Sequence, residues 1–120
     1  MKGERFLNQK SQFDAVYDEG KSLAAKEIVL KTLPNGIGLS RFGFVVSRRV
    51  GKAVVRNRVK RRLREIARQT PVKPGWDIIF IARVPAANAD YVDLGKSVRK
   101  LLLRAGLIIG ENEGNRPFTN

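Results

Sequence analysis

The strongest chemical signal in the sequence is a concentration of positive charge between residues 41 and 68. This segment of 28 residues holds eleven Lys and Arg side chains and one carboxylate, so it carries +10 of the chain's net charge of +13. A surface that serves only solubility would mix the two signs. Cations placed this closely repel one another unless an anion lies among them. The segment therefore predicts the binding of a polyanion, and the phosphates of a nucleic acid match that description.

The middle of this segment is expected to be one helix with an apolar side and a cationic side. No Gly or Pro interrupts residues 53–69, which are rich in good helix formers. At about 100° per residue the stripe expected to face the core consists of Val55, Val59, Leu63, Ile66 and Ala67. The neighbouring stripe, which we call the cationic ridge, consists of Asn57, Lys60, Arg61, Arg64 and Arg68. Arg58 and Arg62 fall on the other flank, with Glu65 between the two basic groups.

Candidates for catalysis by protein side chains are few. The sequence has no His and no Cys, which excludes imidazole bases, thiol nucleophiles, disulfides and Cys/His zinc sites. Asp14 with Asp18 and Glu19, or Asp90 with Asp93, could cluster near helix ends, but helix capping explains each group equally well. No phosphate-binding Gly-rich loop, hydrolase elbow or dinucleotide fingerprint is present. We predict no catalytic residue in the chain, and the sequence leaves a metal site undetermined.

Two aromatic residues, Phe13 and Tyr17, lie four residues apart near the start of the chain. As residues of a short helix they could pack on a sheet, which is the commoner environment of aromatic side chains. They could also stack on unpaired bases, because single-stranded nucleic acids are bound by basic grooves with aromatic faces. Trp76 is expected to be a core or rim aromatic where a strand begins.

The elements that must position these side chains follow from apolar periodicity and from helix and strand breakers. Ser11 and Asp14 indicate a capping box at the start of the first helix. Pro34-Asn35-Gly36 indicates a hairpin turn between two strands. In chain order we expect a helix over 11–20, a short extra strand around 21–25, strands over 26–33 and 41–48, a helix over 53–69, a strand over 77–83, and a helix from 88 or 90 to 106.

This order, α-β-β-(β)-α-β-α, predicts an α+β fold with a small mixed sheet packed with helices. With 120 residues, 42% of them apolar, the chain has the size of one domain. We expect that domain to span residues 1–109 and residues 110–120 to be a flexible tail, because the tail lacks periodicity. The start of the chain has no signal-peptide core, and the apolar run over 78–82 is too short to cross a bilayer. We expect a cytoplasmic protein with no membrane partner.

The segment from Arg41 to Glu65 resembles one known family. It reads RFGFVVSRRVGKAVVRNRVKRRLRE, in which Arg56-Asn57-Arg58 and Lys60-Arg61 follow a glycine-containing strand and a Ser-basic-basic-Val-Gly turn. This string is similar to the RNR motif of the bacterial ribonuclease P protein subunit. The resemblance extends over nearly the whole chain except the tail, and it includes the early aromatic helix and the leucine-rich last helix.

The resemblance implies a function. In that family the protein is the small cofactor of a catalytic RNA that removes the 5′ leader of precursor tRNA by metal-assisted hydrolysis. The implied partners are the ribonuclease P catalytic RNA and precursor tRNA, with no small-molecule substrate. Mg²⁺ would be required by the RNA–protein holoenzyme, and no cofactor would be bound covalently. The chemistry would be carried by the RNA.

The resemblance also implies the contact residues. The catalytic RNA would be bound by the basic helix at Arg56, Asn57, Arg58, Lys60, Arg61 and Arg64, to which the helical periodicity adds Arg68. The leader would lie in a cleft between the first helix and the sheet, at Phe13, Tyr17, Val29 and Lys31. Family members often have an aromatic residue where Lys31 stands and Phe where Tyr17 stands. Lys31 could therefore replace stacking by a phosphate contact.

The implied fold is similar to domain 2 of ribosomal protein S5, with an unusual left-handed βαβ crossover. Such crossovers are right-handed in about 98% of cases, so periodicity alone does not predict this one. Two alternatives share the size and charge of the chain: a structural rRNA-binding protein of ribosomal type, and a DNA-binding regulator that reads with helix 53–69. A strand precedes that helix, which argues against a helix-turn-helix.

Overall fold

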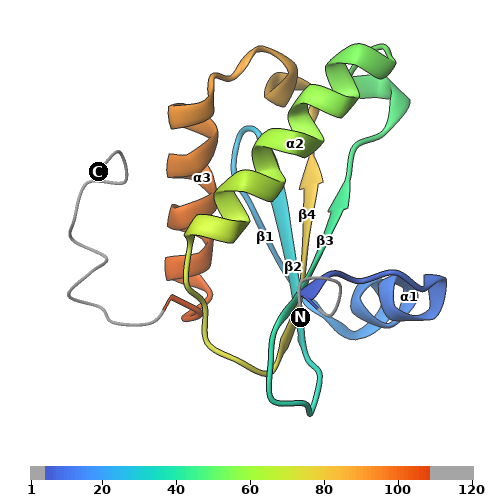
Figure 1. The fold of residues 1–120 in the computed structure, drawn as a ribbon, viewed down its shortest axis with the longest axis vertical. Coiled ribbons are helices and arrows are strands. Elements are labelled where there is room, and N and C mark those ends of the chain that lie inside the picture. Colours follow the sequence, from blue (N-terminus) through green and yellow to red (C-terminus); the bar gives the residue numbers. More distant parts are fainter. Residues whose placement is uncertain (1–4, 109–120) are drawn as a thin grey trace.

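The computed structural model describes residues 5–108, which form a four-stranded sheet with helices on both faces (Figure 1). The helices are α1 (Lys10–Glu19), α2 (Ala53–Gln69) and α3 (Tyr91–Arg104), and the strands are β1 (Lys21–Ala24), β2 (Ile28–Pro34), β3 (Arg41–Val45) and β4 (Trp76–Ala82). Two short 3-10 helices, η2 (Arg48–Val50) and η3 (Val84–Asn88), follow β3 and β4. The α+β prediction is confirmed, including the extra strand. The predicted tail lies outside the described residues.

The sheet is mixed, with strand order β1-β2-β4-β3. β1 and β4 both pair antiparallel with β2, whereas β3 and β4 pair parallel. α2 connects these two parallel neighbours. In Figure 1 both strands point upward, α2 crosses in front of the sheet, and β4 lies to the left of β3, so the connection is left-handed. The crossover that the resemblance implied is therefore present.

The hairpin predicted at Pro34-Asn35-Gly36 is wrong, because β4 lies between β2 and β3. The turn is bound to the start of β4 instead. The Asn35 N–H donates to the Gly75 carbonyl (2.8 Å), and Asn35 Nδ2 donates to Asp77 Oδ1 (2.9 Å). The segment from β2 to β3 is long enough to step across a strand, since neighbouring strands lie only about 4.8 Å apart. The hairpin in this sheet joins β1 to β2.

The predicted cap of α1 also needs correction. The helix begins at Lys10, before Ser11. The side-chain oxygen Oε1 of Gln12 accepts a hydrogen bond from the Gln9 N–H (3.0 Å). Gln9 therefore takes the capping position predicted for Ser11, and Gln12 takes the role predicted for Asp14. Asp14, the expected partner of Ser11, forms an ion pair with Lys10 instead (2.8 Å).

The boundaries of the other two helices agree better with the sequence. α2 spans the predicted residues 53–69. Asp90 caps α3 by accepting a hydrogen bond from the Asp93 N–H (2.8 Å), so capping explains this acidic pair. Gly106, at φ 75°, follows the last turn of α3 in the left-handed conformation that glycine adopts readily.

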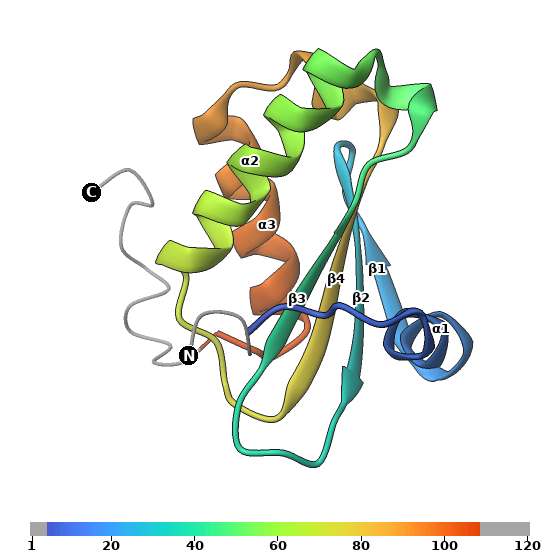
Figure 2. The ribbon, with the colours of Figure 1, turned by 45° about the vertical axis from the view of Figure 1, so that its right-hand side comes forward.

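The pleat of the sheet divides the side chains between two faces. Even-numbered residues of the three longer strands pack with α2 and α3 in the main core, which includes Ile28, Leu30, Phe42, Ile78 and Phe80. A smaller cluster of Leu7, Val16 and Ile79 lies on the opposite side. Figure 2 shows α2 and α3 on one side of the sheet and α1 on the other. We call the side covered by α1, to which the odd-numbered residues of β2, β3 and β4 point, the α1 face.

Candidate nucleic-acid interface

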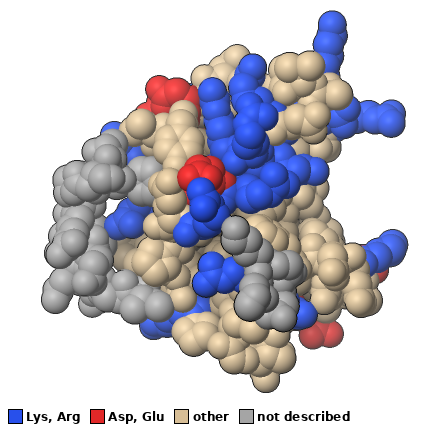
Figure 3. Space-filling model, in the orientation of Figure 1, with Lys and Arg blue, Asp and Glu red and all other residues tan. Residues whose placement is uncertain are grey.

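The cationic ridge predicted on α2 is exposed to solvent. Val59, Leu63, Ile66 and Ala67 are buried and fix the apolar side of the helix in the core, while Val55 is half-buried. The opposite side leaves Asn57, Arg61, Arg64 and Arg68 exposed and Lys60 half-buried. Figure 3 shows Lys and Arg side chains gathered over α2. The helix can thus present several cations to one anionic surface without giving up core contacts.

The carboxylate of Glu65 neutralises one end of this surface. Arg68 Nη2 donates to both Glu65 oxygens (2.7 and 2.8 Å), and Gln69 Nε2 donates to Oε2 (2.8 Å). The hydrogen bond from Arg68 is the main cause that lowers the pKa of Glu65 below its usual value. Among residues 5–108, Arg61 and Arg64 form no ion pair with a carboxylate. Their charges are available to a partner, whereas that of Arg68 is already shared.

Arg58 and Arg62 have intramolecular roles that the sequence did not indicate. Arg62 Nη1 donates to the Ala89 carbonyl (2.9 Å) and Arg58 Nη2 to the Ala87 carbonyl (3.3 Å). The two side chains therefore connect α2 to η3 and to the residues that lead into α3. Within the described part of the chain, Nε of Arg56 and Nε of Arg58 are buried without a hydrogen-bond partner. The placement of Arg58 on the far flank was the only sequence signal that set it apart from the ridge.

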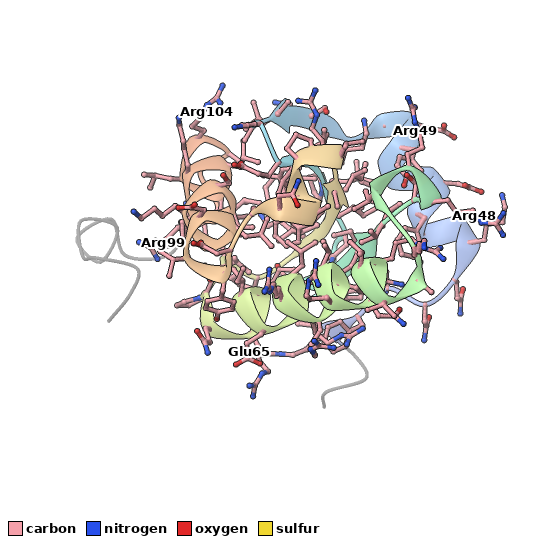
Figure 4. All side chains as sticks on the ribbon, turned by 90° about the horizontal axis from the view of Figure 1, so that it is seen from above. Arg48, Arg49, Glu65, Arg99 and Arg104 are labelled. Carbon is pink, nitrogen blue, oxygen red and sulfur yellow. The ribbon has the colours of Figure 1, made fainter. Side chains whose placement is uncertain are left out.

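Further cations extend the basic surface beyond the amino end of α2. Figure 4 shows Arg48 and Arg49 projecting from η2, while Glu65 lies on the outer side of α2. Both arginines are exposed. Both belong to the basic segment 41–68, but the family resemblance did not place them among the residues that contact the catalytic RNA.

The predicted leader-binding residues lie together on the α1 face. Phe13 and Tyr17 project from α1, and Val29 and Lys31 are odd-numbered residues of β2. Lys31 Nζ lies 6.0 Å from the centre of the Tyr17 ring, at the outer limit of a cation–π contact. Tyr17 is 40% exposed, so part of its ring is open to solvent. Partial burial, with a smaller effect of Asp14, raises the pKa of the Tyr17 hydroxyl above its usual value.

Phe13 lies directly against the backbone of β3. A Cβ atom placed on Gly43 would come within 2.7 Å of Phe13 Cε1, so only glycine leaves room for the ring. The ring is half-buried and packs on the cluster of Leu7, Val16 and Ile79. Much of the Phe13 ring is therefore used in packing against the sheet, whereas Tyr17 has more exposed surface on which a base could stack. Gly43 belongs to this site, and its only sequence signal was a glycine between two phenylalanines.

A metal ion has no evident protein site in the described residues. Between residues 5 and 108 no three Asp or Glu side chains lie close enough to hold one. The carboxylates of the described residues therefore do not form a metal centre.

The basic helix of the left-handed crossover and the aromatic α1 face can be compared with known proteins. A sequence model of the family described as Ribonuclease P matches residues 1–106. The chain belongs to the ribonuclease P protein family. The ribonuclease P protein component of Dehalococcoides mccartyi is 42% identical over 113 residues, which cover 94% of each chain. That of Clostridioides difficile is 43% identical over 106 residues, covering 86% of this chain and 93% of the relative.

Solved structures of ribonuclease P proteins have the same fold. A Staphylococcus aureus RNase P protein mutant with defective mRNA degradation activity superposes with a TM-score of 0.83 at 30% identity, covering 90% of this chain and 93% of that one. The RNase P protein from Thermotoga maritima gives 0.76 at 34% identity, covering 82% and 96%. The chain is thus the protein subunit of the ribonuclease P ribonucleoprotein, a tRNA-processing endoribonuclease, and its partner there is RNA. No helix within residues 5–108 is long and apolar enough to span a membrane.

Proposed function

We propose that α2 binds the catalytic RNA of ribonuclease P along the cationic ridge, and that the α1 face holds the single-stranded 5′ leader of precursor tRNA. The holoenzyme would then remove the leader in the cytoplasm by Mg²⁺-dependent hydrolysis. One observation carries the proposal: directly after the RNR motif, α2 presents Lys60, Arg61, Arg64 and Arg68 on one side, while its other side is fixed in the core. Family membership favours this function over an rRNA scaffold or a DNA-binding regulator.

The ridge would act by electrostatics. Catalytic RNA and precursor tRNA are both polyanions, so their approach is opposed by repulsion that bound cations reduce. Arg61 and Arg64 are free to bind phosphates, and each phosphate that they neutralise also releases counterions. A holoenzyme with these contacts should need less Mg²⁺ to bring the two RNAs together.

The α1 face would distinguish precursor from mature tRNA, because only the precursor has a leader. Tyr17 offers a partly exposed ring for a base, and Lys31 beside it offers a cation for a phosphate. Val29 lies two residues before Lys31 on the same side of β2, and its half-buried side chain offers some apolar surface. Stacking on one aromatic ring contributes about 1 to 3 kcal/mol per base.

The proposal is tested by precursor-tRNA cleavage at low Mg²⁺ with a bacterial ribonuclease P RNA, with and without the protein, near physiological salt. We expect the protein to stimulate production of the mature 5′ end. Absence of stimulation, together with tight binding to rRNA or duplex DNA, would contradict the proposal and favour one of the two alternatives.

The leader contact is tested separately with variants that keep apolar packing but remove the ring. Phe13→Leu and Tyr17→Leu should each weaken binding of precursor tRNA by about 5- to 150-fold, which is the stacking energy above expressed as a ratio. Binding of mature tRNA should stay the same. Tyr17→Phe is the matched control, because it retains the ring. Equal losses for precursor and mature tRNA would show that the α1 face does not bind the leader.

A further inference from the structure

A pocket lies on the side of the sheet opposite the α1 face. It occupies about 480 Å³ between the edge strand β1 and the end of α3, within the range of ligand pockets in proteins. Its lining includes Leu23, Leu30, Thr32, Trp76, Lys21 and Arg104. In the strand register Lys21 stands opposite Thr32 and Leu23 opposite Leu30, so these four side chains form one continuous surface.

The base of this pocket is aromatic and apolar. Trp76, the first residue of β4 and the single tryptophan of the chain, is half-buried there. Its backbone is held in place because the Trp76 N–H donates to Ser40 Oγ (3.0 Å). Leu30 is buried and Leu23 half-buried beside it. A planar group of the size of a nucleobase could lie on this surface, since indole rings are good stacking partners.

The rim of the pocket is cationic. Lys21 and Arg104 are both exposed, and among residues 5–108 neither forms an ion pair. Figure 4 shows Arg104 projecting from α3 on the side where β1 lies. No Asp or Glu is among the lining residues. Arg104 also lies in the last turn of α3, where a cation offsets the negative end of the helix dipole. The rim is thus complementary to an anion.

A planar group on the base and an anion at the rim together describe a nucleoside phosphate. We propose that this pocket binds one unpaired nucleotide of a single-stranded RNA, with its base on Trp76 and its phosphate between Lys21 and Arg104. The pocket and the α1 face lie on opposite sides of the sheet, so the site is separate from the proposed leader contact. The inference does not depend on where the catalytic RNA or the leader binds.

The single tryptophan allows a direct test with the full chain. Penta-adenylate is titrated at low salt while Trp76 emission is followed with excitation that avoids tyrosine. We expect saturable quenching, because a base stacked on the indole would quench it. Lys21→Glu with Arg104→Glu should raise the half-saturation concentration by about tenfold or more, since two phosphate contacts become repulsive. Lys26→Glu with Lys96→Glu is the matched control, because it makes the same charge change at exposed positions outside the pocket.

Three results would overturn the proposal. One is the absence of saturable quenching, and another is an equal loss in the two charge-reversed pairs, which would indicate a general charge effect. The third is an equal response to adenosine monophosphate or to hexaglutamate, which would identify a free nucleotide or an acidic protein segment as the occupant. The ridge variants Arg61→Gln with Arg64→Gln should retain the quenching within about threefold. Failure of ridge binding and failure of the pocket are therefore distinguishable.

Discussion

Arg61 and Arg64, which form no ion pair within residues 5–108, give the sharpest prediction for RNA binding. Arg61→Gln with Arg64→Gln removes two exposed charges while the stem of each side chain remains. Each phosphate neutralised by a protein cation contributes about 0.7 to 0.9 to the slope of log K against log salt. The double variant should therefore lower that slope by about 1.4 to 1.8. Near 0.1 M salt the same loss corresponds to about 25- to 60-fold weaker binding of ribonuclease P RNA.

The choice of these two positions rests on their surroundings. Arg58 and Arg62 donate to backbone carbonyls, and Arg68 is held by Glu65, whereas Arg61 and Arg64 are exposed and form no ion pair in the described residues. Of these five arginines, Arg61 and Arg64 can give their full charge to a phosphate.

The assay is fluorescence anisotropy of labelled ribonuclease P RNA between about 0.1 and 0.4 M salt, a range in which the electrostatic part of binding changes strongly. Lys26→Gln with Lys96→Gln is the control, since it changes the net charge by the same amount at exposed positions away from the ridge. Its slope should stay within about 0.5 of that of the natural protein. If the two pairs lowered the slope equally, net charge and not the ridge would determine binding, and the reasoning would be refuted.

Three further predictions concern residues around the ridge and the start of β4. Asp77→Ala removes a buried carboxylate that accepts two 2.8 Å hydrogen bonds from one guanidinium, so urea denaturation should show a loss of about 3 to 5 kcal/mol. Arg62→Met breaks the hydrogen bond to Ala89 and should cost about 1.5 to 3 kcal/mol in the same assay, with an unchanged salt slope of RNA binding. Glu65→Gln releases Arg68 and should tighten RNA binding about fivefold at 0.1 M salt in anisotropy titrations. The pKa of Glu65 is lower in the folded protein than in the unfolded chain, so its ionised form stabilises the fold fully above the usual carboxyl pKa. This stabilisation disappears as pH falls through the lowered value. The free energies of unfolding of Glu65→Gln and of the natural protein, measured by urea denaturation, should therefore converge as the pH is lowered.

The helices were predictable because their signals are local. An uninterrupted run of helix formers and a 3.6-residue apolar period gave the bounds of α2 and its buried side. Strand pairing is not local: Pro34-Asn35-Gly36 predicted a turn, and a turn exists, but nothing in those residues specifies that β4 would insert between β2 and β3. The hand of the crossover likewise came from the family resemblance.

The candidate site was likewise predictable only in its local features. Which cations lie on the exposed side of α2 follows from the helical period. The helical period does not predict which of these cations already bind another part of the protein. The acceptors of Arg58 and Arg62 are backbone carbonyls 29 and 27 residues further along the chain. Backbone carbonyls carry no sequence signature, so only the tertiary structure separates the available cations from those that hold α2 to η3.

Gly43 connects the sheet to the proposed leader contact, and its replacement tests both. A methyl group there would lie 2.7 and 2.8 Å from two atoms of the Phe13 ring and 3.1 Å from Leu7 Cδ1, so the ring must move away from β3. Overpacking of this kind costs about 1 to 3 kcal/mol, and the moved ring should also lower the preference for precursor over mature tRNA. Gly38→Ala is the control, because its added Cβ meets nothing within 4 Å and should change stability by less than about 0.5 kcal/mol.

A double-mutant cycle assigns the effect to the ring. If Gly43→Ala acts by displacing Phe13, combining it with Phe13→Leu should destabilise the protein less than the sum of the single changes, by at least about 0.5 kcal/mol in urea denaturation. Strict additivity, or a Gly43→Ala variant as stable as Gly38→Ala, would show that the ring does not rest on the strand. The α1 face would then lack the fixed aromatic position on which its proposed selectivity for a leader depends.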